Sequence, residues 1–219
     1  MLLPDFTCTI NIMVTVTDLR LLHSCLLHYK LKFRIGRERT RADGSCFLHM
    51  ILQNIRHFQK LGLWTKTVPS SVHKLRADVI AWMISRKEEF TGHLNSDGRY
   101  IEGPLTEDQF TKLIESQSVE NTYTDEDGFF VWSCCRLLEV SLQIVITSIR
   151  GPMIASGVGG PVQKINSEDG DGRLMFSCGL LRDEERRTGH YQFIYEDERG
   201  ENSTFITPED LNNPVQGLY

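Results

Sequence analysis

The sequence lacks the features that mark membrane, secreted and repeat proteins. The stretch 2–31 is fairly apolar, but Asp5, Asp18 and Arg20 interrupt it. A membrane helix needs about 18 consecutive apolar residues, and this stretch does not provide them. The stretch also lacks the basic start and the small-residue cleavage site of a secretory signal. Internal repeats and low-complexity tracts are absent as well. We therefore expect a cytoplasmic protein that has no membrane partner.

Closely spaced cysteine pairs are also missing. The chain has six cysteines but no Cys-x-x-Cys pair, which disfavours a structural zinc site. Their irregular spacing does not indicate a disulfide framework. We expect reduced thiols, as in intracellular proteins, and no metal or other cofactor. The cysteines are Cys8, Cys25, Cys46, Cys134, Cys135 and Cys178.

The chain has no excess of positive charge. Its net charge is −5 over 219 residues, whereas nucleic-acid-binding domains usually present a basic face with aromatic residues. The basic cluster Arg34, Arg37, Arg39 and Arg41 is not interleaved with aromatic side chains, so we interpret it as a solvated segment. A nucleic-acid partner is therefore not expected. The hydrophobic fraction of 40% is enough for the core of one ordinary domain.

Helical spacing of apolar residues predicts most helices in the first two thirds of the chain. A strand over 7–17 and a helix over 18–31 come first. Helices follow over 45–61 and 71–90, and Thr106-Glu107-Asp108-Gln109 resembles a capping box that opens a short helix. Residues 91–104 are expected to form a loop, and a last helix covers about 129–140.

Strand signals dominate the remainder. Residues 141–149 form a short β-branched run that is typical of a buried strand. The Gly-rich stretch 151–172 is interpreted as a long loop. A hairpin with strands over 173–181 and 190–196 closes the domain. Helices followed by strands favour the α+β class, with a small, mainly antiparallel sheet flanked by helices.

One cysteine stands where a Gly-containing turn enters a helix. In Asp43-Gly44-Ser45-Cys46-Phe47, the helix dipole and the free N–H groups of the first turn would favour a thiolate at Cys46. A thiolate is the nucleophilic form of cysteine. The alternative is a buried structural cysteine.

A histidine far downstream is the candidate partner. His190 opens the last strand and could act as a general base for Cys46. An ordinary hairpin histidine is the alternative. A third group should orient the imidazole, and the candidates are Asp43 and Gln192, which lies two residues after His190 on the same side of the strand. Asp43 could also cap its own turn.

These motifs resemble those of the ovarian-tumour (OTU) family of cysteine proteases. Asp43-Gly44-Ser45-Cys46-Phe47 is similar to the Asp-Gly-x-Cys signature, and Gly189-His190-Tyr191 to the terminal His-Tyr strand. Trp132, a helix and the strand Gln143-Ile144-Val145-Ile146 lie between them, so that the resemblance covers about 38–196. It implies a papain-like α+β fold that cleaves ubiquitin or a ubiquitin-like modifier from lysine side chains.

The chain departs from that pattern in two places. Trp132-Ser133-Cys134-Cys135 stands where members often have Gly-Gly and a glutamate, and Gln192 stands where members often have Asn or Asp. The second departure leaves the third catalytic member open between Asp43 and Gln192.

Three functions are therefore weighed. The leading one is a deubiquitinating cysteine isopeptidase acting on polyubiquitin chains and ubiquitinated proteins, with Cys46, His190 and Asp43 as site residues. The alternatives are an inactive ubiquitin-binding module and a protease that processes a viral or mobile-element polyprotein. The expected organisation is an N-terminal extension over 1–35, a protease domain over 36–198 and a tail over 199–219.

Overall fold

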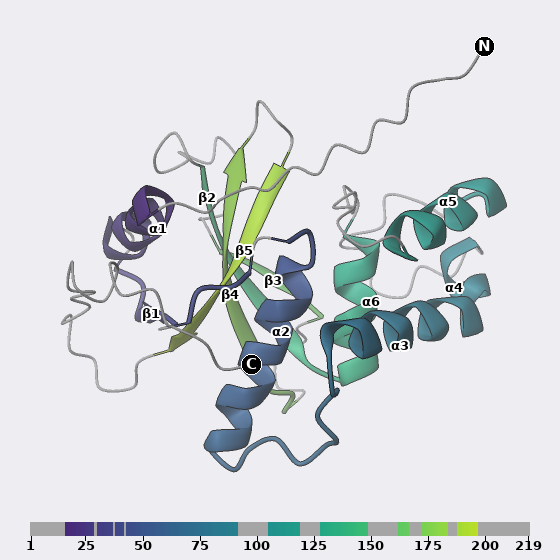
Figure 1. Ribbon diagram of the computed structural model, residues 1–219, viewed down its shortest axis with the longest axis horizontal. Helices are drawn as coiled ribbons and strands as arrows, with labels where there is room; N and C mark the ends of the chain where they lie inside the picture. Colours follow the sequence, from purple (N-terminus) through teal and green to yellow (C-terminus); the bar gives the residue numbers. More distant parts are fainter. Residues whose placement is uncertain are drawn as a thin grey trace.

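A five-stranded sheet with helices on both faces organises the chain (Figure 1). The computed structural model describes residues 16–28, 30–36, 38–41, 43–91, 105–118, 128–148, 162–166, 172–183 and 188–196. The α+β class predicted above is confirmed. The predictions for 7–15, 92–104, 151–161 and the tail lie outside the described residues.

The helix that begins at the candidate cysteine is the central one. Helix α2, Cys46–Lys60, confirms the helix expected over 45–61. Its apolar face is fully buried, with Met50, Ile51 and Ile55 at 0% exposure. The chain turns away just after it, where Gly62 takes the left-handed φ of 71° that favours glycine.

Four helices lie to the right of α2 in Figure 1. They are α3 (Val72–Ser85), α4 (Lys87–Thr91), α5 (Glu107–Ser118) and α6 (Phe129–Leu138). Ser71 caps α3 by accepting a hydrogen bond from the Lys74 N–H. The predicted capping box is confirmed, since the Thr106 and Gln109 side chains each accept the other's backbone N–H, at 3.2 and 2.8 Å.

The single helix predicted over 71–90 was wrong, because the chain breaks at Arg86 (φ −123°, ψ 27°). The break lets α4 turn Phe90 into the core, where its ring meets those of Trp82 and Trp132.

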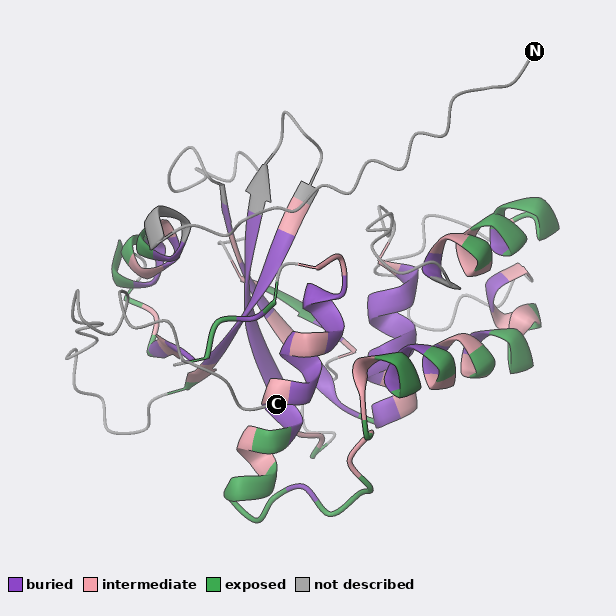
Figure 2. Cartoon of the chain, viewed as in Figure 1, coloured by how far each residue is buried: buried purple, intermediate pink, exposed green. Residues whose placement is uncertain are grey.

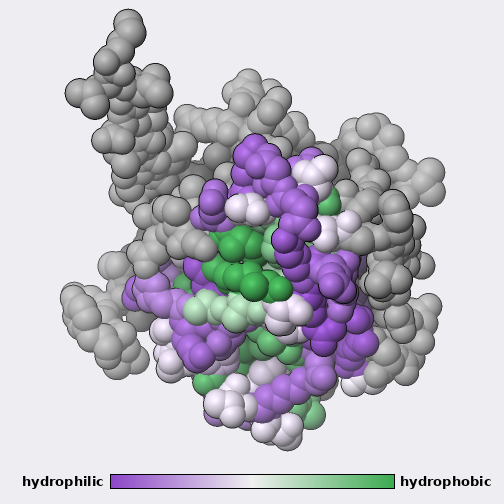
Figure 3. All heavy atoms as spheres, turned by 90° about the vertical axis from the view of Figure 1, so that its right-hand side faces the viewer, coloured by the Kyte–Doolittle hydropathy of each residue, from purple (hydrophilic) through white to green (hydrophobic). Residues whose placement is uncertain are grey.

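Figure 3 shows the surface of this side of the molecule. Hydrophobic residues form a small patch near its centre, and hydrophilic residues surround much of that patch.

The sheet has the order β1-β5-β4-β2-β3. Three of its four pairings are antiparallel and β2 with β4 is parallel, so the mainly antiparallel sheet is confirmed. Two short strands were not predicted: β1 precedes the cysteine turn, and β3 lies inside the expected loop 151–172. The strands are β1 (Phe33–Ile35), β2 (Ser141–Ser148), β3 (Val162–Ile165), β4 (Met175–Asp183) and β5 (Thr188–Glu196).

Each face of the sheet has its own apolar cluster. One face packs on α2 and, beyond it, on α6, which is buried almost throughout (Figure 2). The other face packs on α1, Val16–His28, through Leu22, Cys25 and Leu26. The prediction of a strand over 7–17 is wrong at its end, because residues 16 and 17 begin helix α1. Alternation along the strands explains the two clusters: neighbouring residues of β4 and β5 point to opposite faces.

A buried amide fixes α2 against the sheet. Asn54 is 1% exposed, and its Oδ1 accepts the Ser177 N–H at 3.0 Å while its Nδ2 donates to the Ser177 carbonyl at 3.2 Å. Ser177 comes directly before Cys178, which is the first residue of β4 in the described pairing with β5. Asn54 thus replaces a missing strand partner and sets the position of α2 along β4.

Replacing Asn54 should destabilise the fold. Asn54→Leu has a similar volume but leaves the N–H and carbonyl of Ser177 without this partner, at a cost of roughly 1–3 kcal/mol for each group. We expect a clear drop in the urea midpoint. Gln59→Leu, an exposed change on the same helix, is the matched control and should stay within about 0.5 kcal/mol of wild type. Equal midpoints for the two variants would contradict the role given to Asn54.

Candidate active site

The predicted turn leads directly into α2. Gly44 takes a φ of 78°, and the Asp43 carboxylate accepts the Ser45 N–H at 3.0 Å. The first helical bond runs from the His49 N–H to the Ser45 carbonyl. A glycine is needed here because side chains disfavour this φ. The turn leaves Cys46 as the first residue of the helix.

The segment before α2 runs along one edge of β5, the last strand, and brings Cys46 to it. The Gly36 N–H donates to the Phe193 carbonyl, and the Phe193 N–H donates to Thr40 Oγ1 at 3.2 Å. Two residues earlier on the same edge, the Tyr191 N–H donates to the Cys46 sulfur. The segment from Gly36 to Cys46 therefore follows the edge of β5, and it places the thiol beside the residue that follows His190.

His190 itself is 3% exposed and lies opposite Leu181 of β4. The next residue, Tyr191, faces α2, where its ring lies 5.2 Å from that of Phe47. By alternation, His190 and Gln192 point to the other face of the sheet. The Gln192 amide is engaged there by the backbone, since it accepts the Thr40 N–H at 3.2 Å and donates to the Glu38 carbonyl at 3.4 Å.

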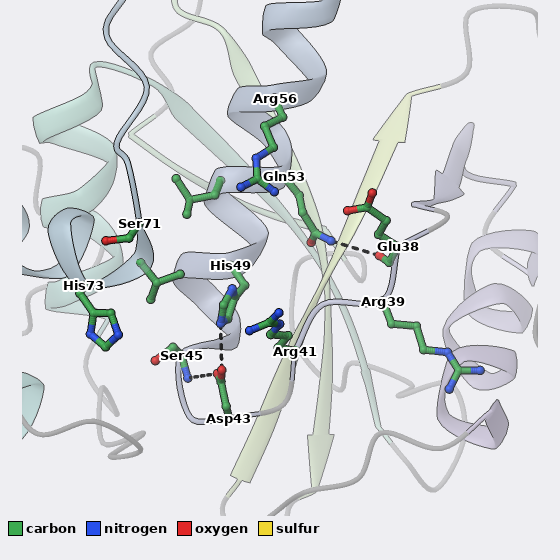
Figure 4. Close-up of a pocket in the computed structure, with 12 residues that line it drawn as sticks. Glu38, Arg39, Arg41, Asp43, Ser45, His49, Gln53, Arg56, Ser71 and His73 are labelled. Atoms are coloured by element: carbon green, nitrogen blue, oxygen red, sulfur yellow. Dashed lines mark hydrogen bonds and ion pairs between the residues drawn. The ribbon is translucent and has the colours of Figure 1, made fainter. Parts of the chain in front are cut away.

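Asp43 is brought to His49. Its Oδ2 lies 2.9 Å from His49 Nε2, and its Oδ1 holds the Ser45 N–H (Figure 4). Partial burial would raise the pKa of Asp43, but the hydrogen bonds from His49 and Ser45, together with the charge of His49, lower it. The structure thus gives Asp43 the turn-capping role. Its role in orienting His190, like that of Gln192, stays a prediction.

Sequence analysis missed the Asp43–His49 pair, although a signal was present. Asp43 lies two residues before the N-cap Ser45, and His49 is the fourth helical residue. In the hydrophobic staple, an apolar residue directly before the N-cap packs on the fourth helical residue, and Asp43 makes a similar contact from one position farther away.

The expected ease of ionisation at Cys46 was wrong. The side chain is 4% exposed, and burial raises the pKa of its thiol to about 11. The negative charge of Asp43 also raises this pKa, while the N–H groups of Tyr191, Phe47 and Cys46 lower it. Removal of water from the sulfur therefore outweighs the start of the helix.

A buried arginine holds the turn from behind. Arg76 of α3 is 6% exposed; it donates to Ser45 Oγ at 2.9 Å and to the Gln117 carbonyl at 2.8 Å. Its guanidinium also lies over the Phe130 ring. This contact ties the N-cap of α2 to the end of α5. Nothing in the local pattern around Arg76 indicated it, because its partners are distant in sequence.

A cleft of about 550 Å³ opens beside the turn (Figure 4). One wall is the segment that carries Glu38, Arg41 and Asp43. The opposite side is formed by α2 and by the start of α3, and the lining is predominantly polar.

The other cysteines that the structure describes are buried residues of the core. The cysteines of the described residues other than Cys46, namely Cys25, Cys134, Cys135 and Cys178, are buried and free of disulfides. Within the described ranges, His, Cys, Asp and Glu side chains form no group that could hold a metal ion. None of the helices described is both long enough and apolar enough to cross a membrane.

Comparison with known proteins gives matches of structure alone. No protein-family model matches the chain, and no curated protein does. In fold the chain is similar to the OTU domain of OTUD1, with a TM-score of 0.48 and 12% identity over 83% of this chain and 96% of that one. The likeness is to OTU structures.

Two more of these structures contain ubiquitin. An OTU deubiquitinase from Wolbachia pipientis wMel bound to ubiquitin has a TM-score of 0.40 and 18% identity, over 75% of this chain and 96% of that one. A complex of h/ceOTUB1, ubiquitin aldehyde and UBCH5B~Ub has a TM-score of 0.37 and 15% identity, over 82% and 72%.

The reactivity of Cys46 should respond to Asp43. Because the Asp43 carboxylate disfavours a negative sulfur, Asp43→Asn should lower the pKa of the thiol while the amide oxygen still caps Ser45. We expect alkylation of Cys46 by iodoacetamide, followed by peptide mass spectrometry, to be slow at pH 8, to rise toward pH 11, and to become a few-fold faster in the variant.

Glu38→Gln is the matched control, since this carboxylate lines the same cleft but is not among the groups that shift Cys46. A rate in Asp43→Asn that equals or falls below that of the control would rule out this electrostatic coupling.

Proposed function

We propose that the chain is a cysteine isopeptidase that hydrolyses ubiquitin or ubiquitin-like conjugates. The observation that carries the proposal is the hydrogen bond from the Tyr191 N–H to the Cys46 sulfur. It joins the two motifs that resemble the OTU signature, although they lie far apart in the chain. In this proposal Cys46 is the nucleophile and His190 the general base, with no metal or cofactor required. Because His190 points to the face of the sheet away from α2, the reaction requires its ring to reach Cys46 around the edge of β5 when substrate binds.

The reaction follows from these two groups. His190 takes the thiol proton as Cys46 Sγ attacks the carbonyl carbon of the modifier's C-terminal glycine. The tetrahedral intermediate breaks its C–N bond, and His190 returns the proton to the departing lysine amine. Water then attacks the thioester and His190 accepts one of its protons. The C–S bond breaks, His190 passes that proton to the departing Cys46 sulfur, and the modifier's C-terminal carboxylic acid loses its remaining proton to solvent.

Backbone groups can stabilise the oxyanion. The N–H groups of Cys46 and Phe47 stand at the start of α2, where helices leave N–H groups without an intrahelical acceptor, and both lie beside the sulfur. Donors in such positions contribute about 2.7–4 kcal/mol each to transition-state stabilisation. The Ser45 N–H is already used by Asp43.

Asp43 remains our candidate third member, beside Gln192. Asp43 lies close to the nucleophile in the chain and carries a full charge. Gln192 lies on the same face of the sheet as His190, but its side-chain amide is already hydrogen-bonded to the backbone of Glu38 and Thr40. We propose that either group acts on His190 once substrate displaces its present partners.

A second candidate is a ubiquitin-binding module with weak or no activity. It is favoured by the burial of Cys46 and by its raised pKa of about 11, which keep the thiol protonated at neutral pH. Both candidates predict ubiquitin as the partner, and they differ in whether a covalent bond forms.

A ubiquitin probe with an electrophilic C-terminus separates the two. We expect covalent capture by the wild type and none by Cys46→Ala. On a panel of diubiquitins, His190→Ala should cleave roughly 10²–10⁴-fold more slowly, because general acid–base catalysis supplies about that factor.

Cys178→Ala is the matched thiol control, since Cys178 is buried on β4, and it should retain capture. Tight binding of ubiquitin without capture would favour the binding module, and diubiquitin cleavage unchanged by His190→Ala would remove His190 from the mechanism.

A further inference from the structure

Arg41 and Arg56 are two positively charged residues of the cleft beside the turn that leads to Cys46. Arg41 and Arg56 are exposed and line the cleft, and within the described part of the chain neither guanidinium makes an ion pair or a hydrogen bond. Two carboxylates line the same cleft: Asp43 is paired with His49, and Glu38 is the other. They are outnumbered by the three arginines of the lining, Arg39, Arg41 and Arg56. Figure 4 shows Arg41 beside His49 and Arg56 farther along α2. The cleft is therefore suited to a ligand that brings negative charge.

The spacing of these arginines limits the ligand. His49 and Arg56 lie seven residues apart on one face of α2, which corresponds to about 10 Å along the helix axis. Arg41 lies at the level of His49. A ligand that contacts both arginines therefore has to extend along α2. In an extended polyproline II peptide, residues three apart point the same way and lie about 9 Å apart.

The lining also argues against nucleic acid. Binding of single strands depends on aromatic side chains on which bases stack, and the cleft presents no Phe, Tyr or Trp. The whole chain is acidic, with a net charge of −5. An acidic peptide fits the lining of the cleft, because carboxylates pair with guanidiniums and need no stacking surface.

We propose that this cleft binds an extended acidic peptide with two carboxylates three residues apart, one on Arg41 and one on Arg56. Binding itself does not require the chemistry of Cys46. The cleft includes Ser45, the residue before Cys46, so the peptide lies against the turn that leads to the thiol. Its role in selecting substrates that carry acidic residues near the cleaved bond rests on the function proposed above.

The test measures binding in a protein that cannot turn over. Fluorescence anisotropy is recorded for a fluorescein-labelled nonapeptide with Glu at every third position and Gly or Ser elsewhere, added to the Cys46→Ala chain at low salt. We expect saturable binding that weakens as salt is added. The additional changes Arg41→Gln and Arg56→Gln should weaken it by roughly five- to thirtyfold. A peptide with Gln in place of Glu should not bind.

The matched control removes two other exposed positive charges, through Arg20→Gln on α1 and Lys112→Gln on α5, and it should bind like the parent. Equal weakening in the control and in the arginine variant would overturn the proposal, because net charge alone would then account for binding. Full competition by inorganic phosphate at low millimolar concentration would overturn the peptide assignment.

Thermal melts confirm that each variant is folded. Capture by the ubiquitin probe is measured separately on the wild type, so that loss of peptide binding can be distinguished from loss of catalysis.

Discussion

The part of the β5 edge that β1 leaves unpaired is the constraint on which the site depends. Backbone groups at the edge of a sheet need partners, and here Gly36, Thr40 and Cys46 supply them. The segment before α2 consequently follows this edge. It delivers the first residue of α2 to the strand that carries His190. The position of the thiol is thus a by-product of satisfying main-chain hydrogen bonds.

Two buried polar side chains then keep α2 in that position. Asn54 joins the middle of the helix to β4, and Arg76 joins its N-cap to α3 and to the end of α5. Both are almost fully removed from water, so their hydrogen bonds are costly to break. The helix cannot slide along the sheet without losing these bonds. The same packing that positions Cys46 also buries it, and this burial is why its thiol is difficult to ionise.

Local patterns predicted the parts of the fold that local forces decide. The helix at Cys46, the capping box at Thr106 and the strand at Ser141 followed from apolar spacing and cap residues. The short strands β1 and β3 did not, because each owes its form to pairing with a distant strand rather than to its own sequence. For the site, the turn and its helix were predictable. The pKa of Cys46 was not, because the burial that sets it comes from residues remote in sequence.

The buried thiol has a consequence for the chemical durability of the chain. With a pKa of about 11, on the order of one Cys46 sulfur in ten thousand is ionised at pH 7. Peroxides attack the thiolate, so the ladder of sulfenic, sulfinic and sulfonic acids starts slowly at such a residue. Burial and the raised pKa therefore both slow the oxidation of Cys46 in the resting protein.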